Sequence, residues 1–177
     1  TFREGLRLEQ ITAKLETLST GVDPKAFYDE ATHPTAKLLA DYPWLSELPD
    51  GASLEGFLYP ATYELVTSSN GPVHGTTADD LVRMMLDKFA SAVGDARMRV
   101  PADRGLTFYQ VVTLASIVER EAVLDVERPL IAGVYQNRLN PKLWPTRLFQ
   151  SDPTVFYVND TLQLAALGFN DWQNDDF

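Results

Sequence analysis

Apolar residues recur every three or four positions in several segments of the chain, a pattern that predicts amphipathic helices. The first segment covers residues 8–18 and stops before Gly21, after which Asp23 and Pro24 supply an N-cap and a first helical residue for a second, short helix. We expect further helices over residues 35–41, 78–93, 108–123 and 128–139. Two of them open with a capping box, formed by Thr77 with Asp80 and by Thr107 with Gln110.

Two other segments are rich in aromatic and β-branched residues, a composition that favours strands. One strand is predicted over residues 54–66, with an interruption at Pro60, and another over 154–158. Residues 67–77 are polar and predict a loop, while the prolines, glycine and serines of 43–53 indicate a boundary between two domains. Because helices outnumber strands, we expect an α+β fold with a helical core and a few strands.

Charge and composition exclude several classes of function. The chain has 177 residues, with 15 Lys and Arg against 25 Asp and Glu, for a net charge of −10, so nucleic acid is an unfavourable partner. There is no cysteine, and the two histidines, His33 and His74, are too few for a histidine metal site or a histidine-based triad to be expected. No apolar run reaches the roughly 18 residues needed to span a membrane. Carboxylates are therefore the remaining candidates for catalysis, and we expect no metal or cofactor.

The predicted helix 108–123 carries two glutamates next to apolar positions. At 100° per residue, Glu119 lies between Phe108 and Val112, and Glu121 lies beside Leu114. A carboxyl group among apolar neighbours is favoured in its neutral form, which suits it to donate a proton near neutral pH. The alternative is that each glutamate pairs with an arginine or reaches solvent at the end of the helix. The arginines available for such pairs are Arg120, Arg128 and Arg138.

Weaker candidates each have an ordinary structural explanation as well. Glu55, which lies among aromatic residues, lines a sugar groove or is a polar residue on the outer face of a strand. The segment Gln150, Ser151 and Asp152 binds a ligand or forms a turn before Pro153. Asn137 is near the end of a predicted helix and contacts a ligand or caps the helix.

Four segments together resemble the YceG-like family of endolytic murein transglycosylases (MltG type). They are EGLRLEQITAKL, LEGFLYPATYEL, LASIVEREA with VYQNRL, and FQSDPTVFY, in that order along the chain. The resemblance implies that residues 1–45 are a portion of a LysM-like domain and that 46–177 are the N-terminal portion of the catalytic domain. It further implies that the membrane anchor and the C-terminal part of the catalytic domain lie outside this fragment, which would leave its groove incomplete.

The resemblance also implies the site. It maps the catalytic glutamate to Glu119, with Glu121 as the fallback, and it maps Glu55, Asn137, Gln150, Ser151 and Asp152 to substrate binding. This chain departs from the family pattern at Ala61. Members of the family usually have an acidic residue at this position, so any contact made by that residue is missing here.

The implied activity is that of a lyase on the bacterial cell wall, without a cofactor. One glutamate acts first as acid and then as base to cleave the β-1,4 bond between N-acetylmuramic acid (MurNAc) and N-acetylglucosamine (GlcNAc), and leaves a 1,6-anhydro-MurNAc end. The implied location is the extracytoplasmic face of the cell membrane, near wall-synthesis proteins, with membrane contact only through the anchor. Two alternatives stay open: a peptidoglycan-binding or scaffold module without catalysis, and a hydrolase.

Overall fold

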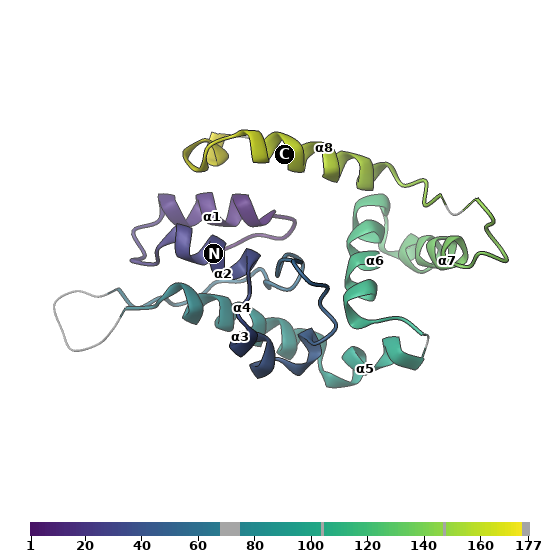
Figure 1. The fold of residues 1–177 in the computed structure, drawn as a ribbon, viewed down its shortest axis with the longest axis horizontal. Coiled ribbons are helices and arrows are strands. Elements are labelled where there is room, and N and C mark those ends of the chain that lie inside the picture. The colour runs from purple at the N-terminus through teal and green to yellow at the C-terminus, as the bar shows by residue number, and fades with distance from the viewer. Residues whose placement is uncertain (68–74, 104, 147, 175–177) are drawn as a thin grey trace.

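The computed structural model describes residues 1–67, 75–103, 105–146 and 148–174, and Figure 1 shows the fold. Helices are the only regular secondary structure in these ranges. They are α1 (Leu8–Thr17), α2 (Pro24–Thr32), α3 (Ala36–Asp41), η1 (Pro43–Leu45), α4 (Ala78–Val93), α5 (Asp95–Asp103), α6 (Phe108–Glu121), η2 (Asp125–Glu127), α7 (Arg128–Leu139), α8 (Asp152–Ala166) and η3 (Phe169–Asn174).

The helices predicted from apolar spacing are confirmed, together with the signals that start them. The Asp23 carboxylate accepts hydrogen bonds from the backbone N–H groups at the start of α2. Both predicted capping boxes form, at Thr77 for α4 and at Thr107 for α6. These interactions are local in sequence, which explains why the sequence was sufficient to predict them. Helix α5, which contains Pro101, was not predicted.

The strand predicted over residues 154–158 is wrong, because these residues belong to α8. Ser151 and Asp152 precede Pro153, and a proline near the first turn of a helix loses no hydrogen bond. Farther along α8, Leu164 is buried and packs with Ala13 of α1 and Trp172 of η3. This burial outweighs the preference of valine and aromatic residues for strands, which depends on having a neighbouring strand to pack against.

The strand predicted over residues 54–66 is also wrong, since the segment has no regular secondary structure. It forms a loop whose Leu54, Phe57 and Leu58 are buried. Gly56 has φ +90°, and a Cβ atom built there would lie 3.4 Å from Val112, so glycine allows the loop to lie against α6. The predicted polar loop 67–77 falls largely on residues outside the described ranges.

The expected α+β fold with a LysM-like portion is therefore wrong. The first 45 residues form α1, α2, α3 and η1 and contain no strand. One hydrophobic core also continues from these helices through the 54–58 loop and α4 to Phe108 of α6. A helical unit of about 45 residues has little core of its own, and here it shares its core with the rest of the chain. The division of the chain near residue 45 stays a prediction.

The second half of the chain is packed more thinly than the first. Helix α6 contacts α5, α7 and α8, and Figure 1 shows α8 above one end of α6 and extending from there toward α1. A small second core joins Leu114 and Val118 of α6 to Tyr135 of α7. Many large apolar side chains between residues 123 and 162 are exposed, which is typical of a surface that contacts other molecules. In the described ranges, no helix is both long and apolar enough to cross a membrane.

We expect the fold to be lost in alkaline solution because several tyrosines have a raised pKa. Burial, with smaller contributions from neighbouring groups, raises the pKa of Tyr28, Tyr42 and Tyr63 from 10.0 to about 12. The folded state thus favours the neutral phenol, so this contribution to stability is complete below pH 10 and is lost as the pH rises toward 12. Circular dichroism should report unfolding in this window, together with a rise in the ultraviolet absorbance of tyrosinate. Ionisation of all 7 tyrosines near pH 10 without unfolding would contradict this expectation.

Candidate active site

Helix α6 packs against two different neighbours along its length, and this separates its two glutamates. Phe108 and Val112, near its start, contact the first core, whereas Leu114 and Val118 face α7 in the second core. Glu121 follows Leu114 and Val118 at helical spacing, so it continues the face that packs on α7. Glu119 lies on the side of Val112, but the first core does not extend that far along α6.

The Glu121 carboxylate is half-buried and is held through one oxygen. The Tyr135 hydroxyl on α7 donates to Glu121 Oε1 at 2.6 Å, and the Ser151 hydroxyl, directly before α8, donates to the same oxygen at 3.3 Å. Burial first, and then the bond to Glu121, raises the pKa of Tyr135 further above neutral pH, so this phenol is a hydrogen-bond donor. Glu121 Oε2 has no protein hydrogen-bond partner in the part of the chain that the structure describes.

Glu119 has a different environment. Its side chain is 61% exposed and forms an ion pair with Arg128, whose Nη2 lies 3.0 Å from either carboxylate oxygen. Arg128 is itself 45% exposed and also lies 3.4 Å from Asp125. This is the arginine pairing that the sequence left open as the structural alternative for Glu119.

The predicted segment Gln150–Asp152 meets Glu121 through its central residue. Ser151 is buried with its hydroxyl on Glu121, whereas Gln150 and Asp152 are exposed. Gln150 has φ +51°, which is unusual for a residue other than glycine. Its carbonyl and that of Phe149 both accept hydrogen bonds from Arg138 Nη1, at 2.9 and 2.6 Å.

Asn137 lies near this segment because it precedes Arg138 at the end of α7. Its exposed side chain lines a cavity of about 340 Å³ together with Arg138, Trp144, Val134 and Leu143. The Arg138 guanidinium lies 5.5 Å from the Trp144 ring centroid and 5.2 Å from that of Tyr135. A series of contacts thus links the cavity to Glu121: Arg138 lines the cavity and contacts the Tyr135 ring, and the Tyr135 hydroxyl donates to Glu121.

Glu55 belongs to a separate polar cluster that ties α8 to the start of α1. Its Oε1 accepts a hydrogen bond from the Tyr157 hydroxyl at 2.8 Å, and its Oε2 accepts one from the Leu8 backbone N–H at 3.2 Å. The Arg7 guanidinium stacks 4.2 Å above the Tyr157 ring and donates to the Tyr157 carbonyl and the Thr161 hydroxyl. Because both oxygens of Glu55 are engaged within the protein, these contacts favour a structural role for it.

We expect replacement of Arg7 by Met to loosen α8. The change removes the bonds to Tyr157 and Thr161 but keeps an apolar stem, and hydrogen bonds to charged groups contribute roughly 1.5–3 kcal/mol. Amide hydrogen exchange in α8 should become faster while exchange in α4 is unchanged. The same substitution at the exposed Arg3 serves as the control. Equal exchange rates in α8 for both variants would show that the Arg7 contacts do not hold this helix.

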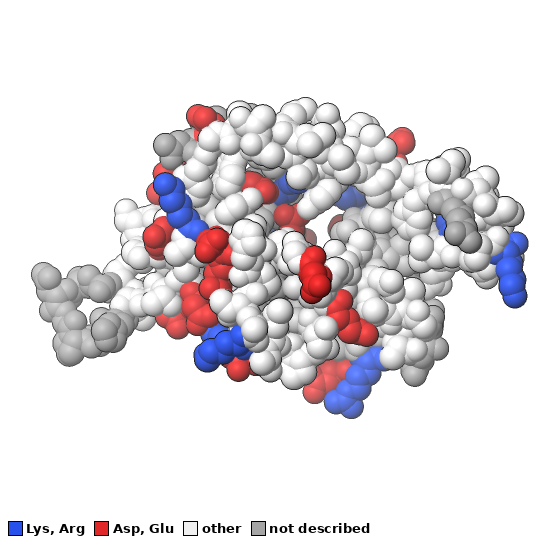
Figure 2. Space-filling model, in the orientation of Figure 1, with Lys and Arg blue, Asp and Glu red and all other residues white. Residues whose placement is uncertain are grey.

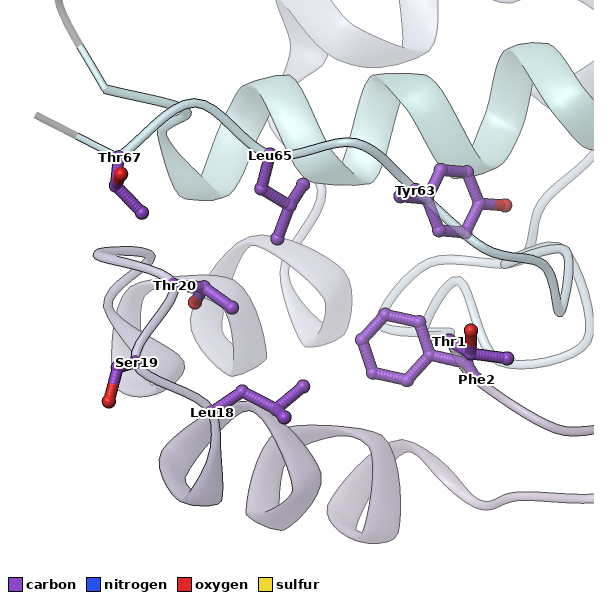
Figure 3. Close-up of a pocket in the computed structure, with 8 residues that line it drawn as sticks. All are labelled: Thr1, Phe2, Leu18, Ser19, Thr20, Tyr63, Leu65 and Thr67. Atoms are coloured by element: carbon purple, nitrogen blue, oxygen red, sulfur yellow. The ribbon is translucent and has the colours of Figure 1, made fainter.

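Figure 2 shows the charged side chains on one face of the molecule, where Asp and Glu are spread widely and the surface is hollowed below α8. A second hollow, shown in Figure 3, is a pocket of about 190 Å³ between α1 and the 63–67 segment. Phe2, Leu18, Tyr63 and Leu65 contribute to its wall, and the remaining lining residues are Thr1, Ser19, Thr20 and Thr67. Among the described residues, no acidic, basic or histidine side chain lines this pocket, so it offers no candidate for acid–base chemistry comparable to Glu121. In the ranges described, no three His, Asp or Glu side chains are grouped to hold a metal ion.

Sequence reasoning missed the contacts that surround Glu121 and Glu55. The sequence did not single out Tyr135, and it offered Arg138 only as a possible ion-pair partner for a glutamate. Their spacing of three residues, which puts both on one helical face, is the signal that was available. Nothing local indicated that Arg7 and Tyr157, which are distant in the sequence, would stack.

The profile of the YceG-like family matches residues 1–175. The endolytic murein transglycosylase of Streptococcus pneumoniae serotype 2 (strain D39 / NCTC 7466) is 34% identical over 174 residues, which are 92% of this chain and 29% of that protein. The endolytic murein transglycosylase of Bacillus subtilis (strain 168) is 34% identical over 105 residues, or 59% of this chain and 26% of that protein. The chain thus spans less than a third of the length of these relatives. No solved structure is significantly similar to it. Because the profile covers nearly the whole chain, the chain belongs to the YceG-like family.

Proposed function

We propose that this chain carries the acid–base residue of an endolytic murein transglycosylase that acts on peptidoglycan glycan strands, and that this residue is Glu121. The observation that carries the proposal is the environment of Glu121, in which one carboxylate oxygen accepts hydrogen bonds from Tyr135 and Ser151 and the other has no hydrogen-bond partner among the described residues. The names of the relatives supply the class of reaction. Glu121 is preferred to Glu119 because the latter is exposed and paired with Arg128.

In the proposed reaction, Glu121 donates a proton to the glycosidic oxygen as the bond from MurNAc C1 to this oxygen breaks. The resulting carboxylate then takes the proton of the MurNAc 6-hydroxyl, while O6 forms the new bond to C1. The product is a 1,6-anhydro-MurNAc end, with no water consumed and the glutamate protonated again. One carboxyl group is sufficient, in contrast to the paired carboxylates of most glycosidases.

The neighbours of Glu121 suit the first step, the donation of the proton. The Tyr135 and Ser151 hydroxyls favour the carboxylate that proton donation leaves behind, because both donate to it. We assign Gln150, Asp152 and Asn137 to the walls of the substrate groove. Their amide and carboxylate dipoles would ease the positive charge that develops on the sugar ring in the transition state. Such a reaction belongs at the outer face of the bacterial membrane, where the glycan strands are.

Incubation of the full-length protein with isolated glycan strands tests the proposal. Mass spectrometry should find new ends that carry 1,6-anhydro-MurNAc. Binding of the strands without new ends would instead identify a peptidoglycan-binding module, and new reducing ends that contain an added water would identify a hydrolase. Either of these two results overturns the transglycosylase proposal.

A further inference from the structure

The backbone of Gln150 adopts a conformation that its side chain does not favour. Its φ of +51° lies in the left-handed region. In the described part of the chain, Gln150 is the only residue other than glycine that has a positive φ. The Cβ atom of an L-residue is crowded there, so the conformation persists only where the surroundings impose it. Such imposed conformations concentrate at functional sites.

The Arg138 guanidinium supplies that constraint. Its Nη1 donates to the carbonyls of Phe149 and Gln150, the two peptide groups that flank the unusual φ. The guanidinium also lies over the rings of Tyr135 and Trp144, at 5.2 and 5.5 Å from their centroids. A flat cation that contacts two rings and is bonded to two carbonyls constrains the path of the chain through Gln150.

This path determines where Ser151 lies. Ser151 follows Gln150 directly, is buried, and donates to Glu121 Oε1, the oxygen that also accepts from Tyr135. Arg138 therefore contacts both elements that hold the carboxylate, the ring of Tyr135 and the peptide before Ser151. Arg138 has no hydrogen bond to Glu121 itself, so its effect on this residue is indirect.

We propose that Arg138 is a positioning residue, which imposes the left-handed turn at Gln150 and so sets the two hydroxyl donors on Glu121. The inference deepens the proposed function and rests on Glu121 being the acid–base residue. Arg138 orients that residue through the Tyr135 ring and the peptide before Ser151.

The test uses Arg138→Lys, which keeps the charge but cannot hold two carbonyls in the same planar geometry. In the full-length protein we expect kcat for anhydro-end formation to fall by about 10- to 100-fold, as for small misplacements of a reacting group, while KM changes little. Adding Gln150→Asn should restore most of kcat, because asparagine tolerates the left-handed conformation and keeps a side-chain amide. Arg128→Lys, on the same helix, is the matched control and should leave kcat unchanged.

A second measurement on the chain itself does not depend on activity. In two-dimensional NMR spectra, Arg138→Lys should shift the Ser151 amide and the Tyr135 ring resonances, and Gln150→Asn should return the Ser151 amide toward its original position. Unchanged Ser151 and Tyr135 resonances in Arg138→Lys would overturn the positioning role, whether or not the protein cleaves glycan strands. An equal fall in kcat for Arg128→Lys, or no recovery with Gln150→Asn, would also overturn it. If the NMR shifts and their reversal occur but no anhydro ends form in the unmodified protein, the proposed function fails while the structural role of Arg138 holds.

Discussion

Glu121→Gln in the full-length protein should lower the rate of anhydro-MurNAc end formation by about 10²- to 10⁴-fold, the range that general acid–base catalysis contributes. Glutamine has nearly the shape of glutamic acid and still accepts hydrogen bonds from Tyr135 and Ser151, but it can neither donate the proton nor take it back. The fold should therefore persist, with the circular dichroism spectrum unchanged. The rate is measured by mass spectrometry of the glycan ends released over time.

Glu119→Gln is the matched control for this experiment. It removes the charge that pairs with the exposed Arg128, and surface ion pairs of this kind contribute only about 0–1 kcal/mol. We therefore expect Glu119→Gln to leave the rate nearly unchanged. The opposite pattern, with activity lost in Glu119→Gln and retained in Glu121→Gln, would return the catalytic role to Glu119.

Phe57→Ala should cost about 3–5 kcal/mol of unfolding free energy, the range for removing a large aromatic side chain from a core. Phe57 is 1% exposed, and its ring lies 5.8 Å from that of Trp44, 5.5 Å from that of Phe89 and 6.2 Å from that of Phe108. These rings come from η1, α4 and α6, so the cavity would weaken the attachment of α6 to the first half of the chain. Chemical denaturation measures the change.

Phe156→Ala is the control for this experiment, because the same atoms are removed from a side chain that is 63% exposed. We expect its effect to stay within about 0.5 kcal/mol, as for most surface substitutions. Equal losses of stability in the two variants would contradict the arrangement of the aromatic core.

The helices of the fold could be predicted wherever their signals are local. Asp23 caps α2, Thr77 and Thr107 start α4 and α6, and the apolar spacing marks the face that each helix buries. Local signals were not sufficient to predict whether a segment forms a strand. The segment 154–158 has the composition of a strand, but a strand needs a partner to bond its backbone, whereas a helix bonds its own. In the described residues no such partner is present, and the segment becomes part of α8.

The site was predictable as a set of segments but not as a set of contacts. The resemblance selected the stretches that contain Glu121, Asn137 and Ser151, and the structure brings Glu121 and Ser151 into contact. The helical wheel gave Glu119 and Glu121 similar apolar neighbours because it projects all turns of α6 onto one circle. In the folded chain the early turns of α6 face one core and the late turns another.

By itself the sequence determined α1 to α4, α6 and α7, the caps of α2, α4 and α6, and the family, because each of these depends on neighbouring residues or on the order of short motifs. Only the tertiary structure decided that Glu121 meets Tyr135 and Ser151 while Glu119 meets Arg128 at the surface. It also decided that Arg7 and Tyr157 hold α8 against α1. The physical reason is the same in each case. The surroundings of a side chain depend on which elements pack against its helix, and this packing depends on residues that are far apart in the sequence.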